Sequence, residues 1–206
     1  MLLTFTVCAA VFAGCSKKSG ADAENPVPPP MTETPVEPAP AAAEPPAPAP
    51  EPAPPPPPKS ASATLAPTKK SKVTGTISFK EVEGGVEVTA AVENLKPGAH
   101  AYHVHEKGDC SAPDAASAGG HFNPGGHPHG APDAEHRHEG DFGNLIAGKD
   151  GKATKTFVMK GITLDDSPTS VVGKGFIVHE KADDFKTQPT GNAGGRVACG
   201  VITLVL

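Results

Sequence analysis

The sequence predicts an all-β domain, an antiparallel barrel or sandwich, that follows a proline-rich tail. After residue 70, hydrophobic and polar residues alternate over several short stretches, glycine-rich turns separate these stretches, and none keeps a 3.6-residue period. Composition divides the 206-residue chain, because 18 of its 25 prolines lie between Pro26 and Pro67 and 21 of its 23 glycines follow Lys70. We therefore expect a signal peptide over residues 1–14, a disordered linker over 15–70 and one domain over 71–206.

The first element, residues 1–14, is typical of a signal peptide. Leu2–Phe12 is apolar but far shorter than the ~20 residues that span a bilayer. It ends in Phe12-Ala13-Gly14-Cys15, which resembles a bacterial lipoprotein signal and implies cleavage before Cys15 and lipidation of that residue. A plain secretory signal is the alternative. We expect an exported protein of the cell envelope, and Ser16 indicates an outer-membrane lipoprotein facing the periplasm or the cell surface.

The second element, residues 15–70, is predicted to be a disordered linker. Ala, Pro and Glu dominate Ala21–Pro67, which carries too little apolar surface to offset the entropy of ordering the chain. Its proline density favours an extended polyproline II conformation. A spacer is favoured over a specific ligand for a proline-binding domain.

The third element is the domain, whose strands are predicted from period-two alternation and from the turns between them. Strands are expected at Val73–Glu81, Val86–Leu95, His100–His105, Asn144–Ala147, Lys152–Met159, Gly175–His179 and Arg196–Val205. With no Trp and one Tyr, the composition argues against a large aromatic core. The long segment 108–143 is rich in Gly, Pro, His and Asp, and a loop of that length is expected to be functional.

Charge and cysteine content narrow the class of protein. Residues 72–206 carry 13 basic and 17 acidic residues, which argues against nucleic acid or an anionic membrane surface as the main partner. Cys8 is lost with the signal and Cys15 is used for the lipid, so Cys110 and Cys199 remain. In an oxidising compartment a disulfide is the default, while free thiols or a metal-bound pair stay open. Neither cysteine has CxxC spacing.

The histidines indicate metal chemistry, because eight of the nine lie between His100 and His138. His103 and His105 alternate in a strand, so both rings can reach one metal, although alone they would be more simply two half-exposed strand histidines. Further candidates follow on the long loop, at H-x7-H-x8-H-x2-D spacing, and this set of three imidazoles and one carboxylate suits four-coordinate zinc. One more histidine lies at the end of a later strand. These further candidates are His121, His129, His138, Asp141 and His179.

The segments HAYHVHEKGDC, GGHFNP, HRHEGDFGN, VHEKADD and TGNAGGRVACGVI resemble the copper/zinc superoxide dismutase family over Val73–Leu206. The resemblance implies a Greek-key barrel of eight antiparallel strands whose loops hold one copper and one zinc per subunit. It implies copper ligands His103, His105, His121 and His179, and zinc ligands His121, His129, His138 and Asp141, with His121 bridging both metals. It also implies a Cys110–Cys199 disulfide, Asp183 hydrogen-bonded to His103 and His129, Arg196 beside the copper, and Thr190 narrowing the entrance.

The activity that the resemblance implies is dismutation of superoxide to O2 and hydrogen peroxide by a redox-cycling copper, which would protect the cell envelope. On a net-negative protein, Arg196 would supply the local cation that this small anion needs. Expected partners are superoxide and, through Cys15, a membrane; both a homodimer and a monomer stay open. The alternative function is an inactive copper/zinc-binding or copper-delivery lipoprotein on the same fold.

Three histidines have no predicted metal role. His100 is expected to be packed and hydrogen-bonded inside the domain. His127 and His136 lie at positions that the family does not use for metal. They are interpreted as solvated, with adventitious metal uptake as the alternative.

Overall fold

The computed structural model describes residues 57–205, so the predicted signal peptide, Cys15 and most of the predicted linker lie outside the described residues. These residues contain one short 3-10 helix, η1 (Ala116–Ala118), and nine strands. The strands are β1 (Ser60–Pro67), β2 (Thr74–Val82), β3 (Gly85–Glu93), β4 (Gly98–His105), β5 (Asp141–Ala147), β6 (Ala153–Met159), β7 (Gly175–His179), β8 (Arg196–Val201) and β9 (Thr203–Val205).

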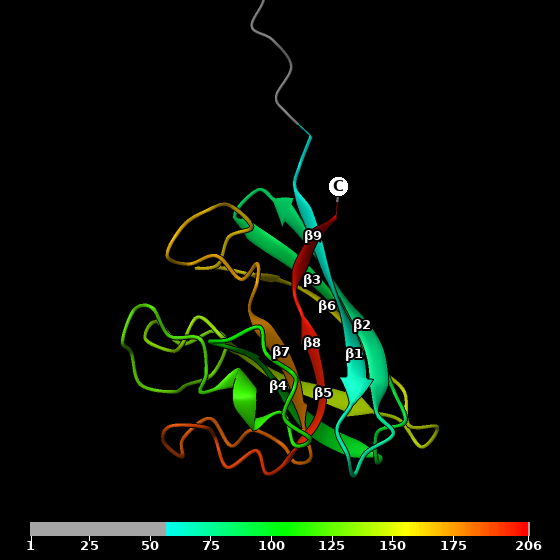
Figure 1. Cartoon of the computed structure of the whole chain (residues 1–206). Helices are drawn as coiled ribbons and strands as arrows, with labels where there is room; N and C mark the ends of the chain where they lie inside the picture. Colours follow the sequence, from blue (N-terminus) through cyan, green and yellow to red (C-terminus); the bar gives the residue numbers. More distant parts are fainter. Residues whose placement is uncertain (1–56, 206) are drawn as a thin grey trace, which may run out of the picture. The chain divides into compact units, whose positions relative to one another are not determined.

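One antiparallel sheet curls into a nearly closed barrel (Figure 1). Its strand order is β5-β4-β7-β8-β1-β2-β3-β6. The connections from β3 to β4 and from β6 to β7 join strands that are not neighbours in this order, as in a Greek key. The predicted all-β, eight-strand barrel is therefore confirmed. The last predicted strand is split at the buried Ile202, and its second part, β9, pairs with β1.

Strand β1 corrects the predicted linker, which was extended to residue 70. Ser60–Pro67 pairs with β2 from Ser60↔Lys80 to Leu65↔Gly75 and then with β8 at Ala66 and Pro67. Burial alternates along it, with Ala61, Ala63 and Leu65 inside. The domain therefore starts about ten residues before the predicted boundary, because these small apolar residues complete the barrel.

Five aromatic side chains fill the centre of the barrel. Their ring centroids lie 5.7–6.1 Å apart, mostly edge to face. The residues are Phe79, Tyr102, Phe142, Phe157 and Phe176. The prediction against a large aromatic core was wrong, because aromatic residues are few in the chain but concentrated at inward positions of five strands.

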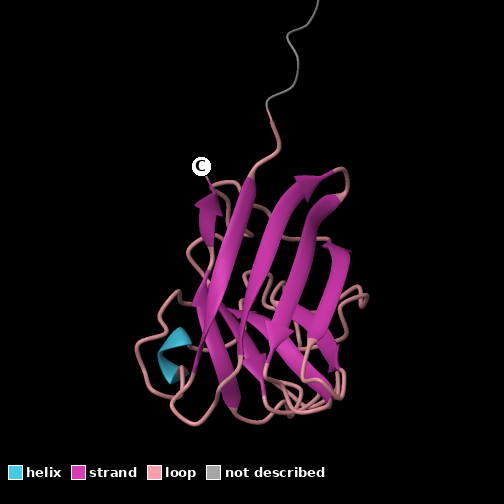
Figure 2. Ribbon diagram, turned by 90° about the vertical axis from the view of Figure 1, so that its right-hand side faces the viewer, coloured by secondary structure: helices cyan, strands magenta, loops and turns pink. Residues whose placement is uncertain are grey.

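The long segment 106–140 is tied to the barrel beside β4. Val104 N donates to Gly140 O, while Phe122 N donates to Val104 O and Gly140 N to Phe122 O. This segment carries η1, which lies at the side of the barrel in Figure 2. A second segment, 180–195, joins β7 to β8. Among residues 57–205, no helix has the length and apolar character needed to cross a membrane.

Candidate metal centre

Four histidines predicted as copper ligands come from two neighbouring strands and the long loop. His103 and His105 end β4, and His179 ends the adjacent β7. His121, in the long loop, forms an isolated antiparallel β-bridge with His105 through its backbone. The strand register shifts next to His103 and again next to His179. Such irregularities redirect side chains, and here they accompany the convergence of the rings.

Each of these four rings has one nitrogen that is buried and lacks a hydrogen-bond partner among residues 57–205. The ligand atoms of the four side chains lie within 4.8 Å of one another. The unpaired atoms are His103 Nδ1, His105 Nε2, His121 Nε2 and His179 Nε2. Buried polar atoms without partners are costly, and four imidazole nitrogens around one point suit copper. The side chains present therefore fit a copper ion.

A second set of four residues meets on the other side of the His121 ring. Ligand atoms of His121, His129, His138 and Asp141 also lie within 4.8 Å of one another, and all four residues are buried. Asp141 Oδ1 lies 2.9 Å from His121 Nδ1, 2.9 Å from His129 Nδ1 and 3.3 Å from His138 Nδ1. Three imidazoles and one carboxylate match the ligands of four-coordinate zinc. His121 is the only residue that belongs to both sets found in the described part of the chain.

The remaining ring nitrogens of His103, His105 and His129 are held by the protein. Asp183 bridges the two sets, with Oδ2 2.7 Å from His103 Nε2 and Oδ1 2.9 Å from His129 Nε2. His105 Nδ1 lies 2.9 Å from the carbonyl oxygen of Gly119 and is its donor. These contacts fix which nitrogen of each ring faces the metal position. The predicted role of Asp183 thus has the expected geometry.

Burial keeps the copper-type histidines neutral. Desolvation lowers the pKa of His103, and it lowers the pKa values of His105 and His179 far below the usual value for histidine. It lowers the pKa of His121 to about 4, against the opposing effect of Asp141. A neutral imidazole has a lone pair available for a metal, so the rings are prepared for binding at neutral pH.

The zinc-type set favours positive charge instead. Burial alone would raise the pKa of Asp141, but hydrogen bonds from the surrounding histidines outweigh it and hold the pKa far below the usual range. Burial would lower the pKa of His129, yet the carboxylates of Asp141 and Asp183 raise it to about 9. His129 Nδ1 lies 2.9 Å from Asp141 Oδ1 as an ion-pair contact but has no hydrogen-bond partner in the described chain. Two carboxylates among buried rings therefore attract a cation.

Arg196 begins β8 beside His179, the residue it pairs with in β7. Its Nη1 donates to Ala115 O at 2.7 Å and its Nη2 to Gly119 O at 2.6 Å. Gly119 O is also the acceptor of His105, so one carbonyl contacts both the predicted copper ligand and the arginine. The predicted position of Arg196 next to the copper-type histidines is consistent with this. Thr190 is exposed in the segment 180–195, and its gating role stays a prediction.

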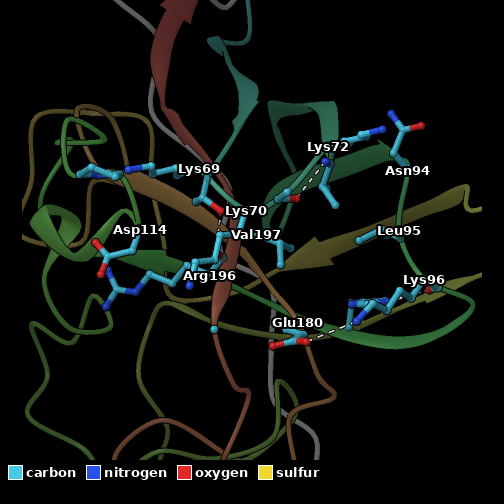
Figure 3. Close-up of a pocket in the computed structure, with 16 residues that line it drawn as sticks. Lys69, Lys70, Lys72, Asn94, Leu95, Lys96, Asp114, Glu180, Arg196 and Val197 are labelled. Carbon is cyan, nitrogen blue, oxygen red and sulfur yellow. Dashed lines mark hydrogen bonds and ion pairs between the residues drawn. The ribbon is translucent and has the colours of Figure 1, made fainter.

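Arg196 also lines a hollow of about 920 Å³ together with several lysines (Figure 3). The lysines are Lys69, Lys70, Lys72 and Lys96, and the hollow also contacts Asp114 and Glu180. Lys96 Nζ lies 3.4 Å from Glu180 Oε1. None of the seven candidate ligand residues lines this hollow, although Arg196 borders both the hollow and the copper-type histidines.

Two further predictions are confirmed close to the centre. His100 is buried, with Nδ1 2.9 Å from His179 O and Nε2 2.8 Å from Lys96 O, so it is structural. Cys110 and Cys199 form a disulfide with their Cα atoms 5.8 Å apart. This bond attaches the start of the long loop to β8.

Two supporting residues were missed by the sequence analysis. Asn144 in β5 donates its Nδ2 to Asp183 O and accepts from Asp183 N, which holds the backbone of that residue. Gln188 accepts from His129 N and donates to His129 O. Both contacts go to backbone atoms of residues far along the chain. Only the position of Asn144 three residues after the ligand Asp141 could have indicated its role.

The chain matches known proteins over the domain. The sequence pattern of the family described as copper/zinc superoxide dismutase (SODC) matches residues 73–202. The chain is 48% identical to superoxide dismutase (Cu-Zn) 2 of Brassica juncea over 139 residues, which are 64% of this chain and 90% of that protein. It is similar to the crystal structure of the clock protein EA4, with a TM-score of 0.66 and 40% identity over 72% of this chain and 96% of that one. The range 73–202 includes every candidate ligand.

Proposed function

The chain belongs to the copper/zinc superoxide dismutase family, and from this premise we infer that it converts superoxide into O2 and hydrogen peroxide. It is an oxidoreductase, and copper and zinc are its cofactors. The observation that carries this function is the pair of buried ligand sets that share His121. An inactive metal carrier is not favoured, because all four copper-type histidines and Arg196 are present at the centre.

We assign copper to His103, His105, His121 and His179, and zinc to His121, His129, His138 and Asp141. The unpaired ring nitrogens support the first assignment and the two carboxylates near His129 support the second. A bound copper supplies a one-electron redox centre. His121 would offer Nε2 to copper and Nδ1, which lies beside Asp141, to zinc, and Nε2 would be the ring nitrogen able to hold a proton because it has no other partner in the described chain.

The roles of the other residues follow from charge. Superoxide is an anion, and residues 72–206 have a net negative charge, so a local cation is needed to attract it. Arg196 fits this role because its guanidinium is fixed by two carbonyls next to the copper-type histidines. A fixed guanidinium can orient an anion at the metal position without loss of further side-chain freedom.

The function is tested by the xanthine oxidase–cytochrome c assay on protein loaded with copper and zinc. We expect inhibition of superoxide-dependent cytochrome reduction, and absence of inhibition would exclude the enzyme.

His121→Ala is expected to abolish activity and to disturb both metals, since it removes a ligand from each set. The exposed Lys149→Ala should keep full activity and serves as the matched control. Full activity of His121→Ala would contradict the shared-ligand assignment.

We also propose that the protein is exported and anchored at the cell envelope through lipid on Cys15, with residues 16–56 as a spacer. The sequence Phe12-Ala13-Gly14-Cys15 and the Ala/Pro/Glu composition support this. Mass spectrometry of the mature N-terminal peptide should find a lipid-modified Cys15, and Cys15→Ser should release the protein from membranes. An unmodified Cys15 in the mature protein would contradict the anchor.

A further inference from the structure

A second pair of histidines lies on the outside of the loop that carries the zinc-type ligands. His127 precedes His129 by two residues, and His136 precedes His138 by two. The ring centroids of His127 and His136 lie 5.1 Å apart, which is as close as the 5.5 Å between His129 and His138. The loop therefore brings two imidazoles together twice, once in the interior and once near the surface, where His136 is exposed and His127 is half-buried.

A carboxylate lies beside the outer pair. A Cβ atom added to Gly125 would lie 2.7 Å from Glu139 Oε1 and 3.0 Å from His127 Nε2, so these two atoms share one small space. Glu139 Oε2 accepts from Gly125 N at 3.4 Å, which leaves Oε1 for another partner. Asn123 holds the backbone of His127 at both its N–H and its carbonyl. The half of the site formed by His127 and Glu139 is thus anchored.

The surroundings are mixed in charge, with acidic groups in excess. A hollow of about 500 Å³ is lined by His127, Glu139, Asp133 and Glu135, and also by Arg137 and Lys160. The guanidinium of Arg137 is directed to the backbone, because it donates to the carbonyls of Pro132, His138 and Lys160. Three carboxylates therefore face two cations, and one of these, Arg137, already donates its hydrogen bonds to backbone carbonyls. Imidazole and carboxylate groups are the usual ligands of zinc and copper(II).

We propose that His127, His136 and Glu139 bind a third metal ion, a divalent transition metal such as Zn²⁺, on the outer face of this loop. The site uses no residue of either inner set, so it can be filled while both inner sets are occupied. Its donors do not converge as tightly as the inner ligands, and the exposed His136 ring must turn toward the ion. Water completes the coordination, and the ion exchanges more readily than a buried one.

The test uses the full mature protein with copper and zinc already bound. Native mass spectrometry and calorimetric titration with ZnCl2 should find one further Zn²⁺ per chain. His127→Ala and His136→Ala should each lower the affinity for the added ion by about tenfold or more, in the range seen when groups that support a metal site are lost. Asp133→Asn/Glu135→Gln, which removes carboxylates from the same hollow and keeps all three donors, should change the affinity far less. Zinc-edge anomalous diffraction of the wild type should place a peak between the two rings.

The outcomes separate this site from the proposed function. Protein that takes up no ion beyond the inner two overturns the outer site and leaves the dismutase intact. A third ion that persists in His127→Ala/His136→Ala also overturns it, because the ion then lies elsewhere. Circular dichroism of each variant checks the fold, and dismutase activity should be retained in all of them since none replaces a residue of the inner sets.

Discussion

At the scale of single residues, Asp183 is the residue that couples the two metal positions. Its two carboxylate oxygens contact ring nitrogens of His103 and His129, which belong to different ligand sets. The same contacts, together with the backbone N–H of Phe185, outweigh burial and hold the pKa of Asp183 well below its usual range. The carboxylate is therefore charged and fixes the orientation of both rings at every physiological pH.

We expect Asp183→Asn to lower metal affinity by about 10–100-fold, as found when groups that orient metal ligands are lost. An amide offers one acceptor instead of two, so one of the two rings loses its partner. Metal content after dialysis against a graded series of chelators measures the effect. Asp166→Asn, an exposed residue away from the centre, is the matched control. Equal metal retention in both variants would show that Asp183 does not position the ligands.

The candidate ligand residues could be identified from the sequence because metal chemistry restricts both residue type and spacing. His103 and His105 are separated by the strand period, and five further candidates follow in recognisable segments. Asn144 and Gln188 could not be predicted in this way. They bind backbone atoms of Asp183 and His129, and any residue can supply such atoms, so no side-chain pattern records the contact.

At the scale of secondary structure, β1 decides where the domain begins. It pairs with β2 along one edge and with β8 and β9 along the other, so it closes the sheet between them. A chain that starts at residue 57 keeps this strand, whereas a chain that starts at residue 71 lacks it. Without β1, the edges of β2 and β8 are unpaired, and exposed edges favour aggregation.

We expect the 57–206 chain to fold cooperatively and the 71–206 chain to be destabilised severely or to aggregate. Burial of Leu65 alone contributes about 1.5–3 kcal/mol, and Ala61 and Ala63 add to it. Thermal unfolding followed by circular dichroism, with light scattering for aggregation, measures the difference. Similar melting temperatures for the two chains would contradict the role of β1.

The sequence could not predict β1 because its composition resembles that of the tail before it. SASATLAP contains three alanines and a terminal proline, and alanine has little preference for strands. Only its period-two alternation indicates a strand, and that signal is weak when the inward residues are small. The aromatic core was missed for the opposite reason, since a count of aromatic residues does not tell how many of them point inward.

At the scale of the whole molecule, the disulfide links the barrel to the metal centre. Cys199 lies in β8, and Cys110 lies in the loop whose residues Ala115 and Gly119 provide the carbonyls for Arg196. Ala115, Ala118, Ile177 and Cys199 form a small buried cluster against which Cys110 packs. The disulfide therefore holds in place the backbone acceptors that position the arginine.

Reduction of the disulfide is expected to lower both stability and activity. The bond joins residues 89 apart in the sequence, and a loop of that length is worth about 4–5 kcal/mol in the chain-entropy description. A loss of that size lowers the melting temperature of a domain of about 150 residues by roughly 8–20 °C. Calorimetry of the wild type with and without reductant measures this without changing the volume of the buried sulfur. Reduction should also lower the dismutation rate of the metal-loaded protein and make that rate less dependent on ionic strength. The reason is that a loosened Gly119 no longer holds Arg196 beside His179. A reduced protein that keeps its melting temperature would contradict the stabilising role, and one that keeps its salt profile would contradict the link to Arg196.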